Sequence, residues 1–311
     1  MIVEVNNLVK KYKNGVVALN GINLEVREGE IFGLLGPNGS GKTTCINCIL
    51  SLLKYDSGTI NVFDKKMMST SYDLKKDIGV IMQNVAVFDE LTVYENIDFF
   101  CGLYIKDKNT RKEYVDWAIK FVSLEDYVKF KPKKLSGGLL RRLHIACGIA
   151  HKPKLIILDE PTVAVDPQSR NKILEGIKEL NKMGSTIIYT SHYMEEIEEL
   201  CSYIVILDKG HVLAHGTKEK LKDMVSKGEK IKVELQGNSK TIIEKVLKIP
   251  GVVDAEVNEN ILSIKTDNEK TLIHEVIDLL NEEKVSYNRI NSEKPSLNDV
   301  FLDLTGRELR D

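Results

Sequence analysis

The sequence predicts an α/β domain followed by a small α+β domain. Up to about residue 220, short apolar runs that resemble buried strands alternate with helix-like segments, which is the pattern of an α/β fold. From residue 230 the predicted order becomes β-α-β-β-α-β, which is typical of a ferredoxin-like domain. The 311 residues exceed what one compact domain usually needs. We therefore expect domains at residues 1–222 and 229–311.

Strands are predicted first in the α/β domain. Residues 2–5 and 16–27 have the pattern of antiparallel strands. Three later runs are apolar throughout and are expected to be strands buried on both faces: Leu155–Leu158, Thr186–Tyr189 and Ile204–Leu207. Together these runs predict a mixed sheet core with an antiparallel β subdomain beside it.

Helix boundaries follow from capping residues. Thr92 and Glu95 form a capping box that opens a helix toward Tyr104. Asp166 precedes a proline at the first helical position, and Gly184 is placed to close the helix that begins there. These signals predict where two helices begin and where the second one ends.

The second domain shows four strand-like runs, two helical patterns and a terminal helix. The strands are expected at 230–236, 252–258, 261–267 and 285–291, the helices at 240–248 and 269–283, and the terminal helix within 295–311 around Phe301. The polar stretch 218–230 is expected to end a helix and link the two domains.

Composition limits the classes of function. The 44 lysines and arginines nearly balance the 46 aspartates and glutamates, so no overall positive field favours nucleic acid, and we expect no nucleic-acid partner. No apolar run approaches the roughly 18 residues that span a bilayer. The N-terminus lacks the basic start and apolar core of a signal peptide. The sequence thus predicts a cytosolic protein or one attached to a membrane through a partner.

The five cysteines are scattered along the chain. Cys45 and Cys48 have a redox spacing, but on a helix they simply share one face. Buried, reduced thiols are the favoured interpretation over a redox pair.

Residues 36–43 read Gly-Pro-Asn-Gly-Ser-Gly-Lys-Thr and fit the phosphate-loop pattern G-x-x-x-x-G-K-[ST] between a predicted strand and helix. Lys42 is expected to reach the β- and γ-phosphates, and the Thr43 hydroxyl to ligate Mg²⁺. The predicted phosphate-binding residues are Gly36, Pro37, Asn38, Gly39, Ser40, Gly41, Lys42, Thr43 and Thr44. The motif predicts binding of a nucleoside triphosphate.

Asp159 and Glu160 end the apolar run that begins at Leu155. An aspartate at the end of a buried strand beside a phosphate loop is placed to hold Mg²⁺. The next carboxylate is placed to polarise an attacking water as general base. A salt-bridged surface pair is the alternative, and the position at the strand end favours catalysis.

Leu135, Ser136, Gly137 and Gly138 form a second candidate phosphate site. Ser136 is a good N-cap, and the two glycines allow close approach of the backbone to a ligand at a helix N-terminus. Because one chain already has its own phosphate loop, this helix end is expected to serve ATP held by another subunit. The pattern therefore predicts a dimer.

Together these motifs resemble the nucleotide-binding subunit of an ATP-binding cassette (ABC) transporter over roughly the first 220 residues. The resemblance implies ATP and Mg²⁺ as cofactors and ATP hydrolysis. It also implies a P-loop ABC cassette fold, in which a helical subdomain accompanies the mixed sheet core and the antiparallel β subdomain. It implies an adenine-stacking role for Tyr12 and a Q-loop role for Gln83 near Mg²⁺ and the attacking water. It also implies that Leu135–Gly138 is the signature segment, Asp166 belongs to the D-loop, and His192 is the switch histidine.

Two segments depart from the family pattern. Leu139 follows the signature glycines where a polar residue is usual, and Ala164-Val165 stands where Gly-Leu or Ala-Leu is common. Both departures fall on the expected dimer interface. Since Ser136, Gly138 and Glu160 are present, we expect an active ATPase site.

The C-terminus indicates which group of ABC ATPases the chain resembles. Pro295–Leu302, the Leu304–Arg307 run after it, and Arg141-Arg142 in the signature helix resemble the exporter ATPases of daunorubicin-resistance and sodium-efflux type. This implies a separate polytopic membrane permease, an exporter of drugs, ions, lipids or peptides, and a second cassette that is either an identical copy or a sister subunit. The chain is then expected at the cytoplasmic face of the cell membrane. Residues 85–104 are the candidate docking surface for the permease.

Other functions fit the sequence less well. An importer ATPase with a ligand-sensing C-terminal domain is the nearest alternative, because a small βαββαβ domain can act as a sensor. A soluble ABC ATPase that acts on ribosomes ordinarily carries two cassettes, whereas this chain has one phosphate loop. The transported substrate cannot be predicted, because specificity resides mainly in the permease.

Overall fold

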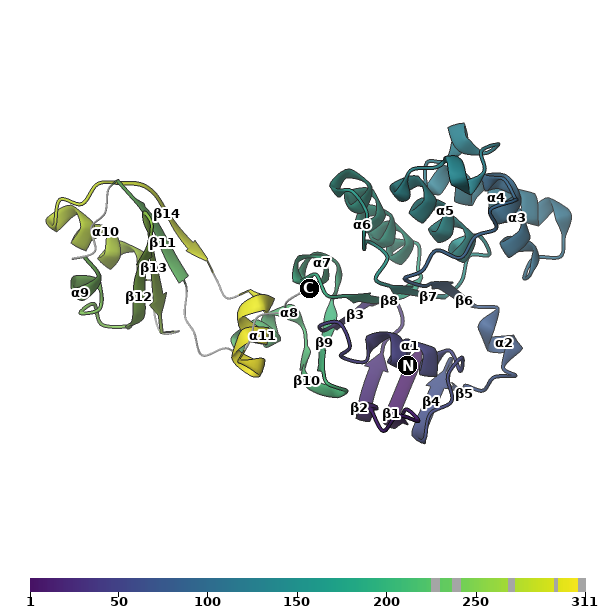
Figure 1. Cartoon of the computed structure of the whole chain (residues 1–311), viewed down its shortest axis with the longest axis horizontal. Helices are drawn as coiled ribbons and strands as arrows, with labels where there is room; N and C mark the ends of the chain where they lie inside the picture. Colours follow the sequence, from purple (N-terminus) through teal and green to yellow (C-terminus); the bar gives the residue numbers. More distant parts are fainter. Residues whose placement is uncertain (225–229, 237–241, 268–271, 294–295, 307–311) are drawn as a thin grey trace. The chain divides into compact units, whose positions relative to one another are not determined.

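The computed structural model describes residues 1–224, 230–236, 242–267, 272–293 and 296–306. The chain forms two compact units, one comprising Met1–Lys218 and one beginning at Glu219. In the first unit, a mixed sheet has helices on one face and a helix plus a second sheet on the other (Figure 1). None of the helices in the described part of the chain has the length and apolarity that a bilayer crossing requires.

The central sheet has six strands. In spatial order they are β10 (His211–Gly216), β9 (Tyr203–Asp208), β3 (Ile31–Leu35), β8 (Thr186–Ser191), β7 (Leu155–Asp159) and β6 (Ile78–Ile81). All neighbours pair in parallel except β10 with β9. Every residue of β3, β7 and β8 is buried, so the predicted two-sided burial of the strands at 155 and 186 is confirmed.

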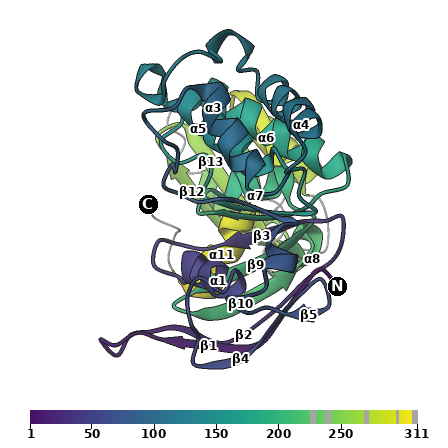
Figure 2. The ribbon, with the colours of Figure 1, turned by 90° about the vertical axis from the view of Figure 1, so that its right-hand side faces the viewer.

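A four-stranded antiparallel sheet covers one face of the central sheet. Its order is β2 (Val17–Val26), β1 (Val3–Lys11), β4 (Ser57–Val62) and β5 (Lys65–Lys66). Helix α1 (Lys42–Ile49) lies between the two sheets (Figures 1 and 2). Alternate residues of β1, such as Val3 and Val5, share one buried core with Leu34 of β3 and Ile46 of α1. This core fixes the first helical turn after the phosphate loop against both sheets.

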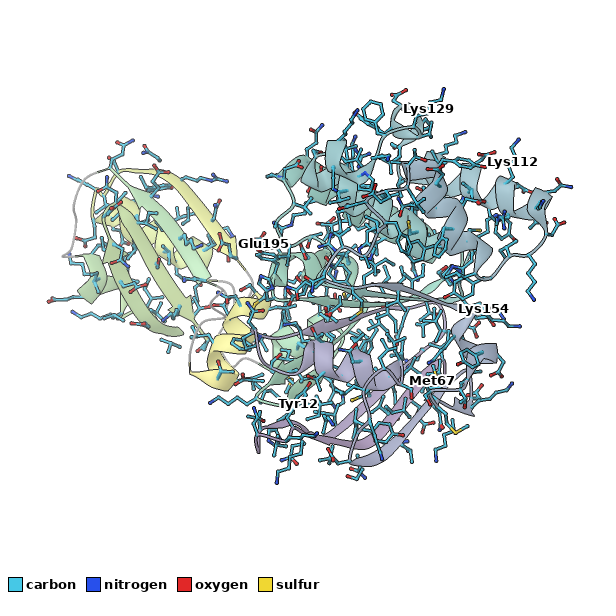
Figure 3. All side chains as sticks on the ribbon, turned by 45° about the vertical axis from the view of Figure 1, so that its right-hand side comes forward. Tyr12, Met67, Lys112, Lys129, Lys154 and Glu195 are labelled. Carbon is cyan, nitrogen blue, oxygen red and sulfur yellow. The ribbon has the colours of Figure 1, made fainter. Side chains whose placement is uncertain are left out.

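Helices pack on the other face and form the expected helical subdomain. They are α3 (Val93–Gly102), α4 (Lys108–Phe121), α5 (Gly137–Ile149), α6 (Pro167–Lys182) and α7 (Met194–Leu200), with α2 (Tyr72–Lys75) beside β6. Two single 3-10 turns, Glu125–Tyr127 and Pro132–Lys134, connect α4 to α5. Lys112 and Lys129 extend outward from this subdomain (Figure 3).

The predicted helix starts are confirmed by their caps. Both halves of the capping box form at α3, since the Glu95 N–H donates to Thr92 Oγ1 and the Glu95 carboxylate accepts from the Thr92 N–H. Asp166 caps α6 by accepting from the Ser169 N–H at 2.9 Å. Gly184 follows the end of α6 at a φ of +103°, a left-handed conformation that closes a helix.

The second unit contains a four-stranded antiparallel sheet with a ferredoxin-like topology. The strands are β11 (Lys230–Leu235), β12 (Val252–Asn258), β13 (Ile261–Thr266) and β14 (Tyr287–Glu293), in the spatial order β12-β13-β11-β14. Helices α9 (Ile242–Val246) and α10 (Ile273–Glu282) contribute Val246, Val276 and Leu280 to its core. The predicted α+β fold is therefore confirmed.

Two further helices, α8 (Lys218–Asp223) and α11 (Leu297–Thr305), complete the described elements. Ser296 and Asp299 form a capping box at the start of α11, which lies within the predicted C-terminal tail. Pro295 and Arg307 of the predicted tail motif, and 225–229 of the predicted linker, lie outside the described residues.

Candidate nucleotide-binding and hydrolysis site

The parallel register of the central sheet brings the sequence motifs together. Leu35 pairs with Ser191, Asp159 with Thr190, and Ile81 with Leu158, so four strands end at one edge. The phosphate loop, Glu160, His192 and Gln83 each follow one of these strand ends directly. Ligands of open α/β sheets bind outside the carboxyl ends of the strands. Motifs more than 150 residues apart thereby meet at one site.

The phosphate loop curls at the start of α1. Gly36 has no room for a side chain, because a Cβ there would lie 2.2 Å from the carbonyl oxygen of Leu207. Gly41 adopts a φ of +112°, a conformation that only glycine adopts readily. Both glycines are therefore needed to form a loop whose N–H groups, with the N-terminus of α1, can surround a phosphate chain.

A cleft of about 540 Å³ opens beside this loop. Asn38, Gly39, Lys42, Thr43 and Thr44 line its loop side. Gln83 and Glu160 from the strand ends line it as well, so predicted phosphate-binding and hydrolytic residues share one cavity. The volume and the mixture of apolar and polar lining residues suit a nucleotide.

Lys42 and Glu160 form a buried ion pair at the bottom of the site. The Nζ of Lys42 lies 3.1 Å from Oε1 of Glu160, and the two side chains are 4% and 5% exposed. The same ammonium donates to the carbonyl oxygens of Gly36 at 2.7 Å and Pro37 at 3.2 Å. Lys42 thus points toward the loop and is fully coordinated by the chain itself.

Glu160 is in contact with both other predicted hydrolytic groups. The amide of Gln83 donates to Glu160 Oε2 at 3.2 Å, and Nδ1 of His192 lies 3.4 Å from Oε1. Glu160 also has a φ of +48°, a left-handed conformation that costs a non-glycine residue about 1 kcal/mol or more. Its N–H is held by Thr190, through Oγ1 at 3.0 Å and the backbone oxygen at 3.2 Å. A strained backbone held in this way orients one carboxylate toward the cleft.

Asp159 is held by two hydroxyls. Thr43 donates to Oδ2 at 2.8 Å and Thr190 to Oδ1 at 2.6 Å, and Asp159 is fully buried. Thr43 and Asp159, both predicted metal ligands, are therefore direct neighbours. The third, Gln83, lines the same cleft. Hydroxyl, carboxylate and amide oxygens are the ligands that Mg²⁺ takes in proteins.

Arg141 fixes the backbone of the Q-loop. This residue of α5 is 5% exposed and donates to the carbonyl oxygens of Met82 at 3.0 Å and Gln83 at 2.7 Å. In the sequence, Arg141 is noted only as part of a helix start that resembles those of the exporter ATPases. Its two bonds join the helix that starts at the signature segment to the residue that contacts Glu160.

Tyr12, which is labelled in Figure 3, also lines the cleft. Its ring is 39% exposed, and its hydroxyl lies 3.2 Å from Oγ1 of Thr44. Sequence reasoning missed the residues that line the cleft beside it: Val16, Val17, Ala18, Lys209 and Gly210. They belong to strand ends and a turn without any motif, so only the fold identifies them.

Two predicted segments lie apart from this cleft. Leu135–Gly138 and Asp166 are not among the residues that line it. Ser136 caps α5 by accepting from the Leu139 N–H at 3.3 Å, as the sequence predicts. A Cβ on Gly138 would lie 2.1 Å from Oγ of Ser169 in α6, so the first turns of these two helices pack closely.

Proteins of similar sequence are named as ATP-binding proteins, which agrees with a nucleotide site in this chain. The chain is 37% identical to the linearmycin resistance ATP-binding protein of Bacillus subtilis (strain 168), over 99% of each protein. It is also 34% identical to the Nod factor export ATP-binding protein I of Rhizobium sp. (strain N33), over 97% of this chain and 96% of that protein. The chain belongs to the ABC transporter family. Residues 19–163 match this family, and residues 216–305 match the C-terminal domain of DrrA1-3-like ATP-binding proteins.

A solved ABC cassette has the same fold. The ATP-binding cassette MJ0796, in a dimeric post-hydrolysis state bound to ADP and Pi, superposes on this chain with a TM-score of 0.64 at 30% sequence identity. The superposition covers 69% of this chain and 98% of that cassette. The predicted resemblance to daunorubicin-resistance ATPases is confirmed by the match of the C-terminal domain. This ABC protein is thus an ATP-binding, ATP-hydrolysing subunit of the kind that powers a membrane exporter.

Proposed function

We propose that this ABC subunit hydrolyses ATP at Glu160 and powers a separate exporter permease. The observation that carries the proposal is the contact of Glu160 with Lys42, Gln83 and His192 at the mouth of the phosphate loop. A carboxylate placed between the phosphate-binding cation and two polar side chains is suited to activate a water beside the γ-phosphate.

Binding of ATP would change the partners of Lys42. The γ-phosphate is a stronger partner for the ammonium than one carboxylate, because it presents several charged oxygens. Its arrival would free Glu160 from the 3.1 Å contact. Glu160 then accepts a proton from water, while Gln83 and His192 hold the water and the transferred phosphoryl group in line. Lys42 and the loop N–H groups stabilise the charge that develops on the phosphate oxygens.

The residues present fit Mg²⁺ as cofactor. Thr43 and Gln83 offer neutral oxygens, and Asp159 offers a carboxylate either as a ligand or as acceptor for a bound water. When bound, the metal neutralises charge on the β- and γ-phosphates.

A second cassette would complete the site. Leu135–Gly138 forms the N-terminal end of α5 and is not among the residues that line the cleft of its own chain. The partner cassette, an identical copy or a sister subunit, would present this segment to the γ-phosphate. The D-loop residue Asp166 would lie at the same interface. Loss of phosphate on hydrolysis removes the bridge and opens the dimer.

The permease would dock on an aromatic patch past the Q-loop, formed by Phe88, Phe99 and Phe100. Phe88 and Phe99 are 47% and 44% exposed, and their rings lie 4.9 Å apart. Phe100 lies 5.8 Å from Phe88 and 5.5 Å from Phe99. Exposed aromatic clusters of this kind mark sites of protein interaction. This docking would hold the subunit at the cytoplasmic face of the membrane.

The relatives indicate the direction of transport. Two relatives are named for linearmycin resistance and for Nod factor export, and both names support an exporter. We place the cassette at residues 1–222 and the accessory domain at 229–311. An importer is also among the relatives, the methionine import ATP-binding protein MetN of Clostridium tetani (strain Massachusetts / E88), but it matches 80% of this chain, whereas the Nod factor export protein matches 97%.

The test is a pull-down from detergent-solubilised native membranes with tagged Glu160→Gln protein, ATP and Mg²⁺. We expect a polytopic membrane protein to co-purify. Phe99→Asp should release that protein and retain ATP binding, whereas Met183→Asp, at a similarly exposed apolar residue at the end of α6, should retain both the membrane protein and ATP binding. Recovery of soluble partners alone would contradict the transporter function.

A further inference from the structure

The carboxylate of Glu196 is buried in the first turn of α7, outside the nucleotide cleft. It is 1% exposed and accepts three hydrogen bonds. Tyr189 and Ser191 donate their hydroxyls at 2.7 and 2.8 Å, and Arg170 donates Nε at 2.6 Å. A buried carboxylate with three short, charge-assisted or hydroxyl bonds is a rigid anchor.

These bonds hold the backbone on both sides of His192. The hydroxyl of Ser191 donates to Glu196 and accepts from the N–H of Tyr193 at 2.9 Å. His192 stands between these two residues in the chain, and its own Nδ1 lies 3.4 Å from Glu160. The position of its imidazole therefore depends on a short turn that Glu196 anchors.

A second connection between Arg170 and His192 runs through the ring of Tyr193. The guanidinium carbon of Arg170 lies 4.7 Å from the centre of the Tyr193 ring, within the range of a cation–π contact. The ring of Tyr193 lies 4.1 Å from the imidazole of His192. Arg170 therefore reaches His192 through contacts with the Tyr193 ring as well as by hydrogen bonding through Glu196.

Arg170 lies in the first turn of α6, four residues after the D-loop residue Asp166. That turn packs against the start of the signature helix, because a Cβ on Gly138 would lie 2.1 Å from Ser169. A change at the expected dimer interface would thus move the same helical turn that carries Arg170. Neither Arg170 nor Glu196 lines the nucleotide cleft.

We infer that Arg170 and Glu196 are positioning residues that set the imidazole of His192 against Glu160 and couple its position to the start of α6. The inference rests on the proposed hydrolytic role of His192. Both residues act through the turn of Ser191 and Tyr193 and never touch the nucleotide. Their removal should slow the chemical step and leave nucleotide binding intact.

The test compares kcat with ATP affinity in the full chain. Arg170→Ala should lower kcat roughly 10- to 100-fold, the range expected when a catalytic group is displaced by about 1 Å. The Kd for ATP should stay within about two-fold of the wild-type value. Arg170→Lys keeps the charge but not the planar stacking group, so it should recover only part of kcat.

Lys178→Ala is the matched control. Lys178 also joins α6 to α7, through a 2.7 Å bond to Glu199, but this pair is exposed and away from the His192 turn. Its kcat should equal that of the wild type. In a His192→Ala background, Arg170→Ala should cause no further loss of kcat, because its effect passes through His192.

A second readout is independent of hydrolysis. The ring signal of His192 in a ¹H–¹³C NMR spectrum, assigned by its loss in His192→Ala, should shift in Arg170→Ala and Glu196→Gln but not in Lys178→Ala. An unshifted signal, or an equal loss of kcat with and without His192, would overturn the inference. A wild-type chain that binds ATP without hydrolysing it would instead overturn the proposed function, and the NMR result would still decide the inference.

Discussion

Glu160→Gln should have opposite effects on the nucleotide-free and nucleotide-bound chain. In the free chain the substitution removes one charge of the buried Lys42–Glu160 pair. In the bound chain the phosphates provide the negative charge, and the missing carboxylate no longer competes for the ammonium. The variant should therefore be less stable alone and bind nucleotide more tightly.

The magnitude follows from the geometry. Two unit charges 3.1 Å apart attract by about 5 kcal/mol at an effective dielectric constant of 20, and desolvation offsets much of this. Removing one partner of a buried pair costs about 3–5 kcal/mol. Lys42 keeps the carbonyls of Gly36 and Pro37, so we expect a loss of about 2–3 kcal/mol in the free energy of unfolding.

Thermal unfolding and calorimetric titration with a non-hydrolysable ATP analogue measure both effects, because the analogue keeps the γ-phosphate and avoids turnover. The melting temperature should fall by about 5–10 °C without nucleotide. If half of the lost energy is regained on binding, the Kd for the analogue should fall roughly 10-fold. Glu199→Gln, in an exposed pair, should change stability by less than about 1 kcal/mol. A Glu160→Gln chain as stable as the wild type, or one with weaker binding of the analogue, would refute the reasoning.

Three further predictions concern groups around the site and in the core. Arg141→Ala removes two bonds to the Q-loop backbone, so it should lower the free energy of unfolding by roughly 2–3 kcal/mol in urea titrations and reduce kcat more than ATP affinity. Burial raises the pKa of the Cys48 and Cys101 thiols to about 11, so a disulfide reagent at pH 8 should label them only after denaturant is added; fast labelling of the native chain would contradict this. Burial lowers the pKa of His144 from about 6.5 to about 4. The unfolded chain therefore takes up this proton first as the pH falls, and stability decreases between about pH 6.5 and 4. His144→Gln should remove roughly 3 kcal/mol of that decrease, and an unchanged pH profile would count against it.

The local signals in the sequence predicted most of the cassette. Caps such as Thr92 and Asp166 fix helix starts through bonds within three residues, so the sequence alone carries them. The buried strand that begins at Leu155 is apolar as far as Leu158, so it too can be recognised from the sequence alone. The phosphate loop depends on glycines whose spacing is visible in one line of sequence.

The remaining contacts of the site could not be predicted, because they depend on pairing between segments that are distant in the sequence. Thr190 was not predicted, because its two bonds to Asp159 and Glu160 exist only when β7 and β8 lie in register. Glu196 looked like one of several surface acids in a polar helix start, and only the fold shows it buried beneath His192. Arg170 was likewise one charge on an amphipathic helix. Such contacts join residues about 20–30 positions apart and produce no periodic pattern in the sequence.

In the proposed dimer, ATP is hydrolysed between two copies or sister cassettes, with Lys42 from one and Ser136 from the other. The most direct measurement mixes full-length Lys42→Ala and Ser136→Arg chains and follows phosphate release. Each variant alone lacks one half of both sites and should be inactive. The mixed dimer contains one site with Lys42 and Ser136 both intact, so activity should return on mixing. A mixture as inactive as its components, under conditions in which the wild-type chain hydrolyses ATP, would contradict the account.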